Sequence, residues 1–171
     1  MEKHFKIGKL VSAFGLKGEM ILQHHLGKKT SLKGLEVMLV EERKGAFLPY
    51  FVAATRIKSD KEIYISLDGV LSRESAARLV GREVWINDSD FKKFASHSAP
   101  ISFLGYHLIH ENQDLGEIVE VIEQPHQVIC RVVINQKDAL IPIHEKTLEK
   151  IDSKKKKLYV TLPDGLLDLY L

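Results

Sequence analysis

Residues 8–19 read Gly-Lys-Leu-Val-Ser-Ala-Phe-Gly-Leu-Lys-Gly-Glu, which predicts a strand, a turn flanked by glycines, and a second strand that begins at Glu19. Gly15 and Gly18 lie three residues apart and allow the positive φ angles that a tight connection needs. The spacing alone leaves two interpretations open. Either the turn merely closes a barrel, or it is a rigid loop that presents Lys17 with Phe14 or Leu16 to a partner.

Short strands are expected along the rest of the chain, which predicts an all-β fold. Residues 63–67 and 158–162 alternate between aliphatic and other side chains, the pattern of a half-buried strand. Further strands are expected at Phe5–Val11, Glu19–Gln23, Glu36–Glu41, Tyr50–Ile57, Glu83–Ile86, Gly116–Glu123, Val128–Ile134 and Ala139–Ile143. So many short strands, separated by Gly, Pro, Asn and Asp, are typical of barrels or sandwiches.

Helical signals are scarce, and one or two short helices are expected. In Ser72–Val80, Ser72 can accept hydrogen bonds from free N–H groups and Gly81 can end the helix. The apolar residues that can pack are Ala76, Ala77, Leu79 and Val80. A second short helix is expected in the tail, where Leu166, Leu167 and Leu169 would cover an apolar opening.

The alternating pattern stops between Asn87 and Pro100, where the sequence is polar, rich in small residues and closed by proline. This stretch is the best candidate for a domain boundary. We therefore expect two small barrels, residues 1–88 and residues 101–171, joined by a linker at residues 89–100.

Composition argues for a folded protein of the reducing cytoplasm. Hydrophobic residues make up 44% and charged residues 28%, the usual globular mix. The N-terminus opens no signal peptide and no run is long enough to span a membrane. A single cysteine, Cys130, excludes an internal disulfide. The net charge is only +2, with +4 in the first 88 residues and −2 in the rest, so any RNA contact should be local.

No pattern for catalysis, metal or cofactor binding stands out. Neither Gly-rich stretch has the spacing of a phosphate-binding loop, and no dinucleotide motif follows a strand. His24 and His25 are adjacent and would face opposite sides of a strand, so the histidines are interpreted as scattered surface residues. Cys130 alternates with Val128 and Val132 on an inward face and has no evident base beside it. We expect no enzyme activity, no cofactor, no metal and no small-molecule substrate.

Three further stretches are candidates for contacts or for the core. Lys154, Lys155 and Lys156 precede a strand and form a hairpin turn, which is either merely solvated or an electrostatic finger for RNA phosphates. Pro125 and His126 interrupt two strands and are expected in an exposed hairpin loop. Trp85 is expected in the core.

The same residues resemble the RimM family of ribosome maturation factors. Ile7–Val11 followed by Phe14–Glu19 is similar to the opening signature of that family, and Leu67–Val70, Ser72–Ala77 and Leu79–Val84 resemble its strand, helix and glycine-terminated exit. The C-terminal half resembles a PRC-barrel through Leu115–Val121, Ala139–Ile143 and Leu162–Asp168. The matches run in family order over essentially the whole chain.

The resemblance implies a fold and a role. The fold is an N-terminal six-stranded barrel of the translation-factor type followed by a C-terminal PRC-barrel. The role is non-enzymatic: binding to the immature small (30S) ribosomal subunit through a protein of its head, ribosomal protein number nineteen of that subunit, with assistance to 16S rRNA processing and head maturation.

Two places depart from the family pattern. Family members commonly carry two adjacent tyrosines where the second barrel begins, a place matched here by residues 99–105, and either Phe103 or Tyr106 is expected to substitute for them. The loop after Val121 usually reads Gly-Ala-Asn-like, whereas here it contains Pro125 and His126. Contacts with the partner at this edge are expected to differ.

The leading hypothesis makes the residues Phe14, Gly15, Leu16, Lys17 and Gly18 the first contact loop of a two-barrel clamp on an assembling subunit. Two alternatives belong to other classes. One is a flavin-binding enzyme built on a small barrel, which bound flavin in the absorbance spectrum would reveal. The other is a generic PRC-barrel interaction module unrelated to ribosomes.

Overall fold

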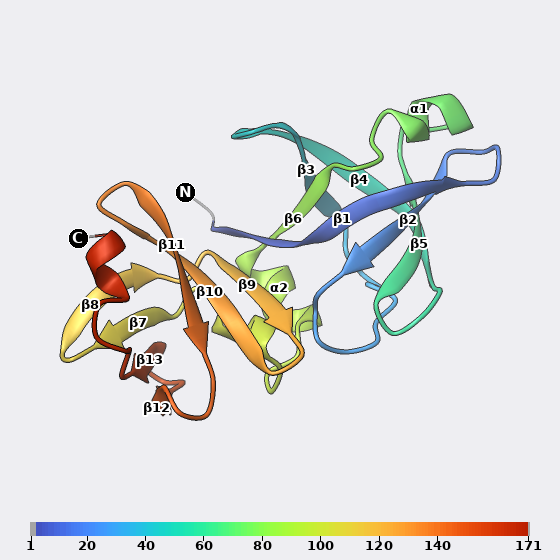
Figure 1. Ribbon diagram of the computed structural model, residues 1–171. Coiled ribbons are helices and arrows are strands. Elements are labelled where there is room, and N and C mark those ends of the chain that lie inside the picture. The colour runs from blue at the N-terminus through green and yellow to red at the C-terminus, as the bar shows by residue number, and fades with distance from the viewer. Residues whose placement is uncertain (1–2, 171) are drawn as a thin grey trace. The chain divides into compact units, whose positions relative to one another are not determined.

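The computed structural model describes residues 3–170, which form thirteen β-strands and a few short helices (Figure 1). The chain divides between Ala99 and Pro100 into two units, each with its own core. No helix in the described part of the chain is both long and apolar enough to cross a membrane. The expected all-β fold class is confirmed.

The first unit is a closed barrel of six strands. The strand order around the barrel is β1-β2-β5-β4-β3-β6. Its strands are β1 (His4–Phe14), β2 (Glu19–His24), β3 (Val37–Arg43), β4 (Ala46–Ile57), β5 (Glu62–Leu67) and β6 (Glu83–Asn87). Closure leaves no strand edge unpaired, which is how small barrels avoid edge-to-edge association.

Strand β1 closes this barrel because it pairs with β2 on one side and with β6 on the other. Both ladders shift register, between Leu10 and Ser12 against β2 and between Lys6 and Gly8 against β6. Such bulges bend a strand and increase its twist, as closure requires. A Cβ at Gly8 would lie 1.9 Å from the Gln23 carbonyl oxygen, so the close approach of β1 to β2 needs glycine here.

Two short helices complete the first unit. Helix α1 (Arg73–Ala77) starts at Ser72, whose hydroxyl accepts a hydrogen bond from the Ser75 amide, and it packs against β1 and β2. Helix α2 (Asp88–Phe94) packs against β6 and β1 and buries Phe91 and Phe94. The predicted linker, residues 89–100, therefore contains a helix that belongs to the first unit.

The second unit consists of two sheets. One has the strand order β11-β10-β9 and the other β12-β13-β7-β8, with β13 parallel to β7. The strands are β7 (His107–His110), β8 (Gln113–Glu117), β9 (Glu120–Gln124), β10 (Gln127–Ile134), β11 (Lys137–Ile143), β12 (Leu148–Asp152) and β13 (Lys157–Val160). Two 3₁₀ turns, η1 (Pro100–Phe103) and η2 (Leu167–Leu169), flank them.

Several local predictions from the sequence were wrong. The strand expected at Gly116–Glu123 is broken into β8 and β9, which lie in different sheets. Trp85 does not lie in the core as expected but is half-buried on the outside of the barrel, because β6 points Val84 and Ile86 inward. Its ring packs edge-on against Phe47, with the ring centroids 5.2 Å apart. In the tail, Leu169 is exposed, so it covers no apolar opening.

His24 corrects the expectation that the histidines lie on the surface. It is fully buried at the end of β2, where its Nδ1 accepts a hydrogen bond from the Leu26 amide at 3.3 Å. Its Nε2 is buried and has no hydrogen-bond partner among the described residues. Burial, with a smaller repulsion from His25, lowers the pKa of His24 from 6.5 to about 4.

This histidine should make the first barrel sensitive to acid. Between about pH 6.5 and about pH 4 the unfolded chain binds a proton at His24 that the folded chain excludes, so stability is complete above this window and falls as the pH drops through it. We expect a loss of about 3 kcal/mol, measured by urea unfolding followed through Trp85 fluorescence. His24→Asn keeps an acceptor for Leu26 and should flatten the profile. His126→Asn, at an exposed site, should not, and an unchanged profile in His24→Asn would refute the assignment.

Candidate functional site

The loop between β1 and β2 projects from one end of the first barrel (Figure 1). Gly15 and Gly18 adopt positive φ angles of 72° and 94°, as their spacing in the sequence indicated. Leu16 is 78% exposed and Phe14 is 42% exposed, while Lys17 also faces the solvent. The loop therefore presents an aliphatic, an aromatic and a cationic side chain together.

A second loop, between β5 (Glu62–Leu67) and α1, holds the first one in place. Gly18 is buried against the backbone of Val70, where a Cβ would lie 2.2 Å from the carbonyl oxygen. The guanidinium of Arg73 donates to the Gly15 carbonyl oxygen at 3.0 Å. Leu71 is exposed to 78% in this second loop. We call Phe14–Gly18 together with Leu71 and Arg73 the barrel tip.

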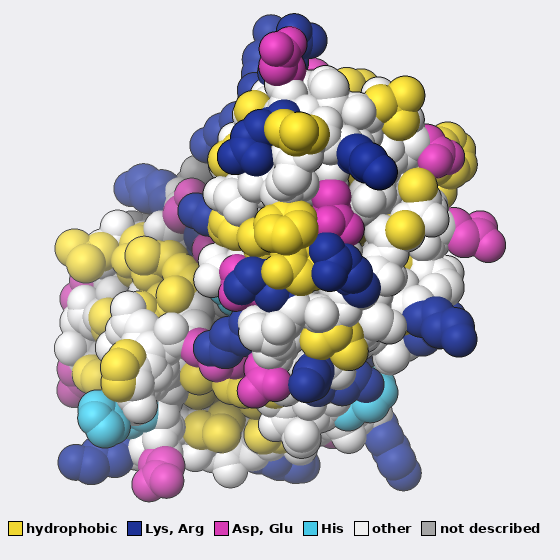
Figure 2. All heavy atoms as spheres, turned by 90° about the vertical axis from the view of Figure 1, so that its right-hand side faces the viewer, with side chains coloured by type: hydrophobic (Ala, Val, Ile, Leu, Met, Phe, Trp, Pro, Cys, Tyr) yellow, Lys and Arg dark blue, Asp and Glu magenta, His cyan; other side chains and the backbone are white. Residues whose placement is uncertain are grey.

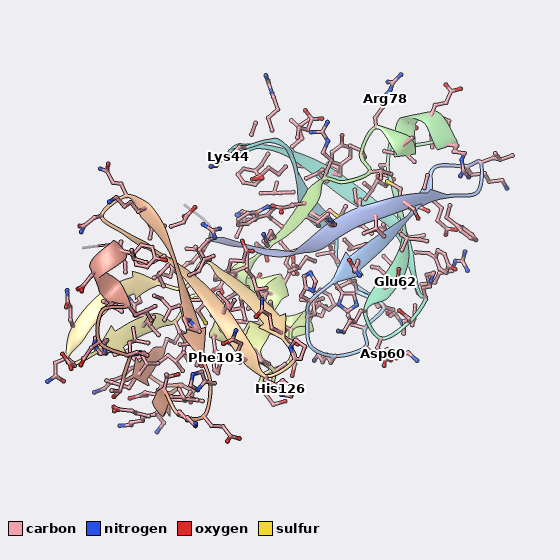
Figure 3. All side chains as sticks on the ribbon, in the orientation of Figure 1. Lys44, Asp60, Glu62, Arg78, Phe103 and His126 are labelled. Carbon is pink, nitrogen blue, oxygen red and sulfur yellow. The ribbon has the colours of Figure 1, made fainter. Side chains whose placement is uncertain are left out.

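Sequence reasoning found the first half of the barrel tip and missed the second. Leu71 and Arg73 are separated from Leu16 by more than fifty residues, and only the pairing of β2 with β5 brings their loops together. The available signal for the second half was Leu71, a leucine that lies outside the alternating pattern and directly before the capping residue Ser72. Arg78, the residue after α1, points away from the barrel at the same end (Figure 3).

Beside the tip, four side chains from four strands stack on the outer face of the barrel. The Phe14 and Tyr64 rings lie 4.7 Å apart, and the Arg56 guanidinium lies 3.9 Å from the Tyr64 centroid and 5.7 Å from that of Phe14. Glu19 accepts two hydrogen bonds from Arg56, from Nη2 at 2.8 Å and from Nε at 3.3 Å, which raises the pKa of Arg56. We call Phe14, Glu19, Arg56 and Tyr64 the Arg56 platform.

Charge is unevenly distributed around this platform. Lys17 and Arg73 make no ion pair with another described residue, whereas Lys58 pairs with Glu62 at 3.3 Å. Glu62 and Asp60 lie at the opposite end of β5, away from the tip (Figure 3). Figure 2 shows apolar side chains set among Lys and Arg on this side of the molecule. The tip end therefore carries two cations without an ion pair, Lys17 and Arg73, together with the exposed carboxylates of Asp68 and Glu74.

In the second unit, Phe103 and Tyr106 lie just before β7. Both rings are half-buried, with centroids 6.0 Å apart, and η1, which carries Phe103, packs against β9. Pro125 and His126 form the exposed turn between β9 and β10, as expected. Figure 3 shows Phe103 and His126 toward the same side of this unit.

Lys154, Lys155 and Lys156 occupy the turn between β12 and β13, which confirms the predicted hairpin. All three are exposed, and Lys156 has a positive φ of 54°. The Lys155 amide donates to Asp152 at 3.0 Å, and this bond lowers the pKa of the Asp152 carboxyl. The three ammonium groups are thus carried on an ordered turn.

The remaining reactive group is the thiol of Cys130 on β10. It lies in the core of the second unit, and burial raises its pKa to about 12. A thiol in that state is a poor nucleophile at neutral pH. The described residues contain no group of three His, Cys, Asp or Glu side chains that could hold a metal ion.

Models of two protein-family domains match the chain. The model of the RimM N-terminal domain matches residues 5–91, and the model of the RimM PRC barrel domain matches residues 100–166. The chain belongs to the RimM family. Its second unit is therefore a PRC barrel, as the sequence resemblance implied.

Individual RimM proteins resemble the chain over nearly its whole length. A ribosome maturation factor RimM from Parabacteroides distasonis is 33% identical over 172 residues, 98% of each chain. One from Christiangramia forsetii is 25% identical over 99% of this chain and 98% of its own. The crystal structure of a 16S ribosomal RNA processing protein RimM from Pseudomonas aeruginosa, 21% identical, covers 94% of this chain and 98% of its own, with a TM-score of 0.44.

Gly15 and Gly18, the two glycines of the loop between β1 and β2, should differ sharply in their tolerance of a side chain. A Cβ at Gly15 meets nothing within 4 Å, so Gly15→Ala costs only the positive φ, about 1–2 kcal/mol. Gly18→Ala adds the clash with Val70 and should cost about 2–4 kcal/mol. Urea unfolding followed by Trp85 fluorescence measures both. Equal losses would show that Gly18 does not hold the two loops together.

Proposed function

We propose that this RimM-family chain is a non-catalytic factor in the maturation of the small ribosomal subunit, acting in the cytoplasm. Family membership over both domains is the observation that carries the proposal, because the curated relatives are named ribosome maturation factors. The exposed tip of the first barrel and the two exposed turns of the second unit support a binding role, since loops on rigid scaffolds are common contact sites.

Contacts with 16S rRNA are assigned to cationic groups on ordered turns. Lys17 at the barrel tip and Lys154, Lys155 and Lys156 in the β12–β13 turn are all exposed. Ammonium groups attract phosphates without reading bases, so these residues would position the factor on rRNA. The modest net charge of +2 fits a few local contacts better than a wide basic surface.

The protein contact is assigned to the PRC barrel. Its proposed partner is ribosomal protein number nineteen of the small subunit, in the subunit head. Phe103 and Tyr106 supply half-buried aromatic area, and Pro125 and His126 supply an exposed rim, an arrangement typical of interface centres and edges. Binding would favour the mature arrangement of the head because a ligand shifts a conformational equilibrium by its differential affinity.

The role predicts selective association with immature subunits. Tagged full-length chain added to extract should sediment with small-subunit precursors and leave mature small and large subunits largely unbound. Replacing Lys154, Lys155 and Lys156 by Gln should weaken this association and flatten its dependence on salt, by roughly 0.7–0.9 in the log–log slope for each lost phosphate contact. The control is Lys28→Gln with Lys29→Gln, two exposed lysines of the loop between β2 and β3. A chain found only in the free fractions at low salt would overturn the role.

The proposed contact between the PRC barrel and ribosomal protein number nineteen predicts a second result. Full-length chain immobilised on beads should retain purified ribosomal protein number nineteen, and Phe103→Leu with Tyr106→Leu should weaken retention about tenfold or more, because buried aromatic anchors dominate interface energy. Phe47→Leu, which changes an aromatic side chain of the first barrel, is the control. Retention that is equal in all three proteins would remove the assignment to this aromatic pair.

A further inference from the structure

The Arg56 platform has a feature that barrel stability does not require. Arg56 is 57% exposed at its side chain although it is fixed in orientation by Tyr64 beneath it and by Glu19 at its edge. Exposed ion pairs add little to stability because water and salt screen them. The arrangement therefore adds little to the stability of the barrel, but it fixes the orientation of the planar guanidinium of Arg56.

The bonds to Glu19 determine which part of Arg56 a ligand can use. Glu19 occupies Nε and Nη2, the edge that would otherwise grip a carboxylate or phosphate in bidentate fashion. Tyr64 covers one face of the guanidinium. What remains for a ligand is the other face and Nη1. A flat partner that stacks is favoured, because the edge of Arg56 that would grip a carboxylate or phosphate is already occupied.

The surroundings add two cations that a phosphate could reach, although the exposed carboxylates of Asp68 and Glu74 lie at the same end of the barrel. Phe14, whose ring is 42% exposed, joins the platform directly to the barrel tip. There Lys17 and Arg73 carry positive charges with no ion pair among the described residues. Flat stacking surfaces next to unpaired cations are what single-stranded nucleic acid requires, since its bases stack and its phosphates need counter-charges.

We propose that the Arg56 platform stacks an unpaired base of single-stranded RNA, while Lys17 and Arg73 contact the neighbouring phosphates. The proposal rests on the proposed function, since it names unpaired RNA as the ligand of the barrel tip. The base lies against the exposed face of Arg56 and the ring of Phe14. Stacking of this kind tolerates any base, so the site selects for unpaired structure and not for sequence.

The test compares two probes on purified full-length protein at low ionic strength. Fluorescence anisotropy measures binding of labelled oligouridylate and of an abasic oligomer of the same length, which keeps the phosphates and lacks the bases. The wild-type chain should prefer oligouridylate by about tenfold, the effect of one stacked base. Arg56→Lys keeps the charge but loses the plane, and Phe14→Leu keeps the bulk but loses the ring. Each should lose this preference.

Controls separate stacking from charge and from folding. Arg43→Lys is the same exchange at an exposed arginine in the β3–β4 hairpin, and it should keep the preference. Lys17→Gln with Arg73→Gln should flatten the log–log salt dependence by about 0.7 for each lost contact. Trp85 fluorescence reports whether each variant is folded. If Arg56→Lys unfolds, the comparison of the two probes on the wild-type chain still decides.

Equal affinity of the wild-type chain for both oligomers, or no binding of either, would overturn this proposal. That result leaves sedimentation with small-subunit precursors untouched, so it would not refute the ribosomal role. Conversely, a clear base preference in a chain that never joins precursors would support the RNA site and refute the role. The two proposals therefore fail by different measurements.

Discussion

The double pairing of β1 (His4–Phe14) is the constraint on which the first barrel and its surfaces depend. One strand must satisfy β2 and β6 at once, and it does so through two register shifts and a close approach at Gly8 that no side chain would permit. Closure fixes the direction in which β1 leaves the barrel, so the loop after Phe14 projects from a rigid end. The packing of Gly18 on Val70 then ties that loop to the one before α1.

Rigidity of this kind fits a protein that works by binding. A preorganised loop loses little conformational entropy when it meets a partner, so modest contacts still contribute to affinity. The barrel tip, the Arg56 platform and the β12–β13 turn each hold a few cationic or aromatic groups on ordered backbone. The thiol of Cys130 and the imidazole of His24, by contrast, are buried in the two cores. The groups that could contact a partner are at the surface.

Local patterns predicted most strands, the capping of α1 by Ser72 and the hairpin at Lys154–Lys156, because alternation and turn residues act over a few positions. These patterns failed where tertiary contacts determine whether a helix forms or which way a side chain points. Helix α2 forms because Phe91 and Phe94 find a core to enter, and Trp85 lies outside because its neighbours in β6 point inward. The Arg56 platform could not be predicted from the sequence either, since its four residues come from four strands whose order only the closed barrel establishes.

The rigid barrel tip is proposed to meet rRNA in an assembling small subunit, and Leu16, exposed to 78%, is the residue best placed to report that contact. The most direct measurement replaces Leu16 by a photo-activatable amino acid in the full-length chain and irradiates it with small-subunit precursors. We expect a crosslink to 16S rRNA that disappears when mature subunits replace the precursors. Crosslinks to protein alone, or none at all despite stable association, would contradict it.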